Sequence, residues 1–72
     1  MEFRYDPEAD CAYIQLVPIA RGGVHESVLV ADEFPELRGD VNLDLSPEGR
    51  LLGIEIVGAR QFLPTELLSA KR

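Results

Sequence analysis

The sequence has a single cysteine, Cys11, and no obvious cluster of metal-ligating residues. A lone thiol cannot form an intramolecular disulfide, so neither a disulfide nor a bound metal is expected to staple the fold. With 72 residues the chain has room for one domain, expected over 1–72, and such a short chain is marginally stable alone. Because 46% of the residues are hydrophobic, we expect the protein to gain stability as a homodimer.

Basic residues are also few, seven against thirteen acidic ones, which leaves a formal charge of −6. Binding to phosphate backbones needs a basic stripe, and here the basic residues are scattered except at the C-terminus, so no nucleic-acid partner is expected. An acidic surface suits solubility, or a basic protein partner. Neither a signal peptide nor a long apolar run is present, which predicts a cytoplasmic protein without membrane association.

The sequence contains the same pattern twice, at 3–17 and, forty residues later, at 43–57. Each copy has a Pro-Glu turn between two short segments of alternating apolar residues, which is typical of strands buried on one face. Asp or Ser before the proline suits a type I turn. The pattern predicts two similar β-hairpins. Since such turns also arise independently, true duplication and coincidence both stay open.

Loops of four residues, 7–10 and 47–50, give each hairpin a register in which the inward pairs are apolar throughout. The expected pairs are Phe3–Ile14, Tyr5–Ala12, Val41–Ile56, Leu43–Ile54 and Leu45–Leu52. A slip of one residue would set apolar side chains against polar ones, so the register is strongly specified. Whether the two hairpins share one sheet or are exchanged between subunits is not decided by this pattern.

The opposite face of each hairpin is expected to turn toward water, and on it Tyr13 and Glu55 mark a candidate partner surface. There Arg4 lies opposite Tyr13, which allows a cation–π contact, and Asn42 lies opposite Glu55. No two carboxylates are directly opposed in this register.

The segments around the hairpins complete the predicted fold. Val24–Ala31 is rich in β-branched residues and carries an inward-leaning charge at Glu26, which indicates an edge strand. Residues 32–40 are expected to form an acidic loop, and Pro64 begins a helix of about seven residues whose leucines dock on the sheet or on a second subunit. We therefore expect a mainly β (α+β) fold: a small antiparallel sheet of two similar β-hairpins plus an edge strand, with a short C-terminal helix.

No catalytic, cofactor-binding or metal-binding residue is assigned from the sequence. His25 and Glu26 are strand neighbours that point to opposite faces, so they cannot act on one atom together. The acidic side chains of 6–10 have the spacing of a calcium loop without its glycine and distal glutamate, and turn chemistry explains them better. Cys11 is expected to face an acid and stay inert. Mid-strand Gly53 suggests a bulge or a close backbone approach.

Residues 5–16 and 43–56 together resemble the YuzE-like family of short prokaryotic proteins of unknown function. In that family a Tyr-Asp-x-x-x-Asp-x-x-Tyr-Ile segment precedes a Gly-x-Leu-x-Gly-Ile-Glu-Ile segment, and both stand in this sequence. The stretch 31–40 is longer than the family's usual connection, and Cys11 and Pro18 depart from the pattern. The resemblance implies the fold more firmly than a function, although similar proteins encoded beside small toxin-like proteins suggest an antitoxin role.

Three hypotheses of function follow. The first is a non-enzymatic homodimer that serves as a protein–protein interaction module. The second is an antitoxin-like partner that neutralises a basic toxin through the acidic loop at 32–40 or the C-terminal segment. The third is a small-molecule site at the dimer seam near Tyr13, Gln15 and Glu55.

Overall fold

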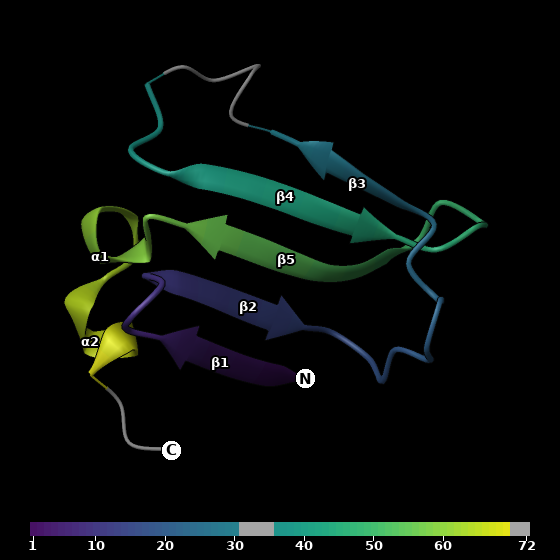
Figure 1. Ribbon diagram of the computed structural model, residues 1–72, viewed down its shortest axis with the longest axis horizontal. Helices are drawn as coiled ribbons and strands as arrows, with labels where there is room; N and C mark the ends of the chain where they lie inside the picture. Colours follow the sequence, from purple (N-terminus) through teal and green to yellow (C-terminus); the bar gives the residue numbers. More distant parts are fainter. Residues whose placement is uncertain (31–35, 70–72) are drawn as a thin grey trace.

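The computed structural model describes residues 1–30 and 36–69, and it is mainly β, as the sequence predicts. Five strands form one antiparallel sheet in the order β1-β2-β5-β4-β3 (Figure 1). The strands are β1 (Glu2–Asp6), β2 (Cys11–Gln15), β3 (Glu26–Leu29), β4 (Asp40–Leu45) and β5 (Leu51–Val57). Within the described ranges, no helix is both long and apolar enough to cross a membrane.

Two short helices follow the sheet where one had been expected, so the prediction of a single C-terminal helix was wrong in this respect. They are α1 (Ala59–Phe62) and α2 (Thr65–Leu68). Between them Leu63 and Pro64 have extended backbone, with ψ angles of 153° and 138°. A residue that precedes proline is driven out of the helical region, which explains the break at Leu63.

The first pair of strands, β1 and β2, has the register that the apolar pattern predicts. Phe3 lies opposite Ile14 and Tyr5 opposite Ala12. Asp6 helps to form the connecting turn, because its Oδ1 accepts a 3.0 Å hydrogen bond from the backbone N–H of Glu8.

The pairing of β4 with β5 agrees with expectation in its middle and departs from it near the turn. Leu43 lies opposite Ile54, but Leu45 lies opposite Leu51 and not opposite Leu52. The cause lies in the turn, where Gly49 has a φ of 81°. A type I turn followed by a left-handed glycine closes a loop of three residues, one fewer than the expected four, so Ser46 bonds Arg50 and the strand absorbs the extra residue as a bulge.

The strands β2 and β5 join these two pairs in a single sheet. Ile14 lies opposite Ile54, the position forty residues later, while Tyr13 faces Glu55 and Gln15 faces Gly53. Of these pairs only Ile14 and Ile54 are equivalent positions of the two sequence copies, and the pairs on either side of them exchange places, as an approximate twofold axis perpendicular to the sheet requires. The hairpins lie in one sheet of one chain.

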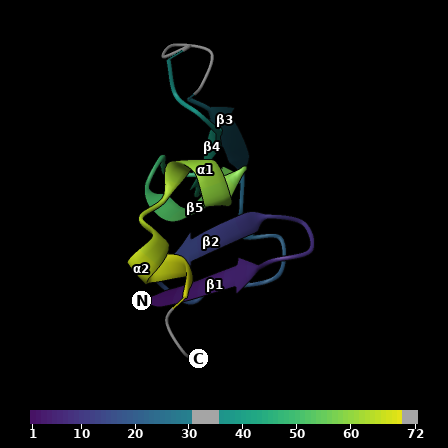
Figure 2. The same ribbon diagram turned by 90° about the vertical axis from the view of Figure 1, so that its left-hand side faces the viewer.

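The core is small and lies at one end of one sheet face. Figure 1 shows both helices at the end where β5 stops and β4 starts, and Figure 2 shows them in the foreground when this end faces the viewer. Ala12, Ile56 and Ala59 are the buried apolar residues of the described chain. Side chains of Phe62, Leu63 and Leu68 are among those that pack against this cluster.

Asp10 fixes this end of the molecule by accepting several hydrogen bonds. Its carbonyl accepts bonds from the backbone N–H groups of Gly58 (2.9 Å) and Ala59 (3.0 Å). Its Oδ1 accepts bonds from the Tyr5 hydroxyl (2.8 Å) and the backbone N–H of Arg60 (2.9 Å). The turn between β1 and β2 is thus tied directly to the start of α1, fifty residues later in sequence.

Candidate functional site

Beyond the helices, the apolar face of the sheet presents a row of five side chains that crosses all five strands. Each residue of the row pairs with the next one on the adjacent strand, in the order Phe3, Ile14, Ile54, Leu43 and Val28. We call these residues the open apolar row. None of the five is buried, and Val28 is 37% exposed.

The neighbouring row of the apolar face is buried where the helices pack on it. Ala12 and Ile56, which lie directly under the helices, are 1% and 4% exposed. Phe3, Ile14 and Ile54 touch the edge of this cluster but keep intermediate exposure. Two helices of four residues each cannot cover a sheet of this width, so residues 1–30 and 36–69 leave the open apolar row in partial contact with solvent.

The polar face carries a second row of paired residues, which runs from Arg4 through Tyr13 and Glu55 to Asn42. The Arg4 guanidinium lies 5.6 Å from the centre of the Tyr13 ring, which confirms the expected cation–π contact. The amide of Asn42 donates a long hydrogen bond of 3.4 Å to Glu55.

Tyr13 also joins a hydrogen-bonded chain across the polar face. Its hydroxyl donates to Oδ2 of Asp44 (2.8 Å), and the hydroxyl of Ser27 donates to Oδ1 of the same carboxylate (2.6 Å). Burial, followed by the hydrogen bond to Asp44, raises the pKa of Tyr13 to about 12. The phenol is therefore neutral near pH 7 and acts as a hydrogen-bond donor that ties β2 to β4.

Gly53 makes this position of the tyrosine possible. A Cβ atom at residue 53 would lie 2.5 Å from Cζ of Tyr13 and would also collide with its hydroxyl oxygen. The sequence suggested a bulge or a close backbone approach at Gly53. The structure instead shows the close approach of a side chain, and the irregularity in β5 lies nearer the turn.

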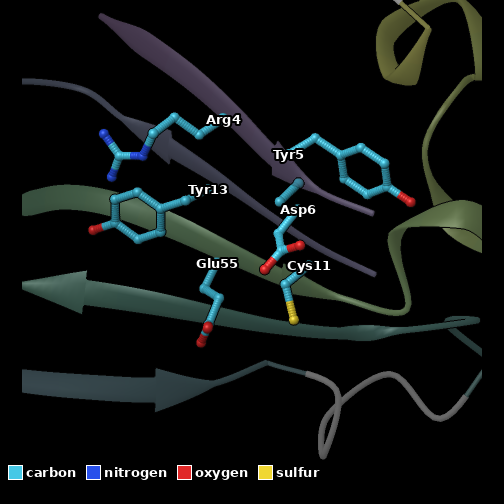
Figure 3. Close-up of a pocket in the computed structure, with 7 residues that line it drawn as sticks. Arg4, Tyr5, Asp6, Cys11, Tyr13 and Glu55 are labelled. Atoms are coloured by element: carbon cyan, nitrogen blue, oxygen red, sulfur yellow. The ribbon is translucent and has the colours of Figure 1, made fainter. Parts of the chain in front are cut away.

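The polar face contains a hollow of about 340 Å³ beside the tyrosine, which we call the polar-face pocket. Figure 3 shows the Tyr13 ring pointing away from Asp6 and Cys11, with Arg4 above the ring. Since Tyr13 leans toward Gly53, the space over Cys11 is left open. The residues that line the pocket are Arg4, Tyr5, Asp6, Cys11, Ala12, Tyr13 and Glu55.

The structure brings together two of the three residues named for a small-molecule site. Tyr13 and Glu55 are paired and both line the polar-face pocket, while Gln15 lies one row away and accepts a 3.4 Å hydrogen bond from Arg4. Cys11 lies opposite Asp6, as expected, and its thiol lies 3.5 Å from the carbonyl of Ala9.

The remaining candidates stay apart from this region. His25 and Glu26 are both exposed at the start of β3. In residues 1–30 and 36–69, no group of three or more His, Cys, Asp or Glu side chains is placed to hold a metal ion.

Sequence reasoning missed the bond from Tyr13 to Asp44 and two other polar contacts that organise the faces. One is the bond from Ser27 to Asp44, and the other is the bond from Tyr5 to Asp10. The second had a signal in the sequence, because the last residue of the turn, a frequent left-handed position, is an aspartate. Its φ is 56° in the structure.

Taken together, the fold and these two surfaces define a small single-sheet protein with one incompletely covered apolar face and one polar face that holds a pocket. Comparison with known protein families shows to which of them the chain belongs. The profile of a protein family of unknown function, DUF2283, matches residues 2–60, and the chain belongs to this family. No curated protein and no solved structure gives a significant match.

Proposed function

We propose that the protein is a non-enzymatic interaction module that works as a homodimer, with the apolar faces of two copies packed against each other. The observation that carries this proposal is the open apolar row, which crosses the full width of the sheet without becoming buried. The YuzE-like resemblance of residues 5–16 and 43–56 belongs to the same proposal, since it implies a short protein without an agreed catalytic activity.

The dimensions of the molecule favour a second copy as the occupant of this face. The chain measures 33 × 31 × 17 Å, so each broad face is large for a protein of this size. A stable interface buries ~800 Å² on each partner, which such a face can supply even with one end under the helices. A twofold dimer presents the same patch from both sides, so an apolar row meets an apolar row.

Two neighbouring residues of β3 offer a matched test of this interface. Val28 is 37% exposed on the apolar face, and Leu29 is 39% exposed on the polar face. Val28→Glu should dissociate the dimer, because it places a charge in the proposed seam, while Leu29→Glu should leave the dimer intact. Sedimentation velocity at micromolar concentration distinguishes these species, since the dimer has twice the 8.0 kDa mass of one chain.

Other results of this experiment would contradict the proposal. A wild-type chain that sediments only as a monomer removes the dimer altogether. Dissociation by both substitutions would indicate pairing through the β3 edge, and dissociation by neither would indicate a surface remote from β3.

Small-molecule binding is a second candidate function, and the polar-face pocket is the observation that favours it. Its volume of about 340 Å³ lies within the ~300–1,000 Å³ range of ligand sites. The pocket opens on the face opposite the open apolar row, so we do not propose it at the dimer seam. The two functions can therefore be tested separately.

The antitoxin-like role stays a prediction. Its two proposed docking elements are the acidic loop at 32–40 and the C-terminal segment, of which residues 32–35 and 70–72 lie outside the described residues. Co-expression with a small basic protein encoded nearby tests it, and unchanged toxicity would count against it.

A further inference from the structure

We propose that the polar-face pocket binds a small organic cation, namely an alkylammonium or guanidinium group on a short aliphatic body. This inference rests on the second proposed function, binding of a small molecule in the same pocket, and it adds the chemical class of the ligand. It follows from the charges that line the pocket and from the shape that Tyr13 gives it.

No cation of the described residues forms an ion pair with the carboxylates of the pocket, Asp6 and Glu55. Asp6 accepts a hydrogen bond from the backbone N–H of Glu8, and Glu55 accepts one from the amide of Asn42. Both donors are neutral, and among the described residues neither Asp6 nor Glu55 forms an ion pair.

Among the described residues, Arg4 is the one cation that lines the pocket, and it is already engaged. Arg4 forms a 3.3 Å ion pair with Glu2, which lies outside the pocket, and donates a hydrogen bond to Gln15. Its guanidinium also lies over the Tyr13 ring. With Arg4 offset by Glu2, the lining keeps the negative charge of Asp6 and Glu55, which attracts a cation and repels an anion.

The shape of the pocket suits a short aliphatic body behind the charged group. Tyr13 turns its hydroxyl away to Asp44, so what it offers the pocket is its ring and not a hydrogen-bonding group. Cys11 and Ala12 are small and weakly polar, and they line the same space. A volume of about 340 Å³ limits the ligand to the smallest class of metabolites.

Three probes of matched shape test the charge requirement: n-butylamine, n-butanol and butyrate. Amide NMR titration of the full chain should show saturable changes at Cys11, Tyr13 and Glu55 with butylamine, weaker changes with butanol and none with butyrate. Cys11 is the single thiol of the chain and lines the pocket, so bound butylamine should also slow its alkylation by iodoacetamide.

Two conservative substitutions test the residues. Asp6→Asn and Glu55→Gln keep the shape and one of the two acceptor oxygens, and each should weaken butylamine binding about two- to fivefold, as expected for one solvent-exposed ion pair. Glu26→Gln on β3, remote from the pocket, is the matched control and should leave the affinity unchanged. Added salt should weaken the wild-type affinity because it screens exposed charges.

The outcomes separate this inference from the function on which it rests. Equal binding of butanol and butylamine, or butylamine binding that survives both substitutions, overturns the ligand class but leaves small-molecule binding in the pocket. Failure of all three probes to shift these amides or to protect Cys11 overturns both.

Discussion

Replacing Gly53 with alanine should release Tyr13 from its place on the polar face. The new Cβ would lie 2.5 Å from Cζ and 2.9 Å from Cε2 of the tyrosine ring, too close for either to stay. Because the ring is the mobile end of a side chain and Gly53 lies in a paired strand, the ring should turn away while the strand keeps its position. Tyr13 then loses both its packing and its bond to Asp44.

The pKa of Tyr13 measures this release directly. It is about 12 in the wild type, raised first by burial and second by the hydrogen bond to Asp44. A displaced ring loses both causes, so in Gly53→Ala the pKa should fall to about 10, the ordinary value for tyrosine. Asp44→Asn removes the charge but leaves the ring packed, so its Tyr13 pKa should lie between the two.

The raised pKa also predicts how stability depends on pH. The folded state favours the neutral phenol, so this contribution is complete below about pH 10 and is lost as pH rises through about 12. A rise of this size corresponds to at most ~2.7 kcal/mol. Tyr13 is partly exposed, and solvent screening reduces the expected contribution to ~1 kcal/mol.

Carbon-13 NMR of labelled tyrosine rings measures the pKa values of the two tyrosines, Tyr5 and Tyr13. The Tyr13→Phe variant shows which of the two signals belongs to Tyr13. Urea unfolding across the same pH window should show the ~1 kcal/mol loss in the wild type and not in Tyr13→Phe. Asp40→Asn, in the same strand as Asp44, serves as the control and should leave the Tyr13 pKa unchanged. A Tyr13 pKa that stays near 12 in Gly53→Ala would refute the proposed close packing.

Two further substitutions test how the end of the sheet is fixed. Asp10→Ala should lower the free energy of unfolding in urea by about 2–3 kcal/mol, since it removes the acceptor of Tyr5 and Arg60 and leaves alanine at a positive φ. Asp10→Asn should cost about 1 kcal/mol, and equal losses in both variants would contradict this account. Gly39→Ala should cost about 1–3 kcal/mol, because its Cβ would lie 2.5 Å from the backbone oxygen of Val57. Wild-type stability in this variant would show that β4 and β5 can separate there at little cost.

The strand registers show which residue pairs can be predicted from the sequence and which cannot. The pairs Phe3–Ile14 and Leu43–Ile54 could be predicted because alternation with a period of two permits only one apolar register around each turn. The pair Leu45–Leu52 was predicted wrongly because the left-handed Gly49 closes its turn one residue earlier than a four-residue loop does, and the apolar pattern alone does not show this.

Part of the candidate site could be predicted from the sequence for the same reason. Alternation places Tyr13 and Glu55 on the outward face, and both line the pocket. The hollow itself depends on the direction in which Tyr13 leans, which Gly53 and Asp44 decide from two other strands. Side-chain packing between segments so far apart has no signature in local periodicity.

The sequence by itself determined two hairpins, the residues of each that face inward, and the absence of a second thiol for a disulfide. These properties depend on neighbours along the chain, where turn chemistry and side-chain alternation act directly. Tertiary structure decided that the two copies meet at Ile14 and Ile54, that Asp10 holds α1, and that the helices leave one apolar row only partly buried. These features depend on which surfaces come together in three dimensions, and the periodicity of a single strand carries no information about its distant partner.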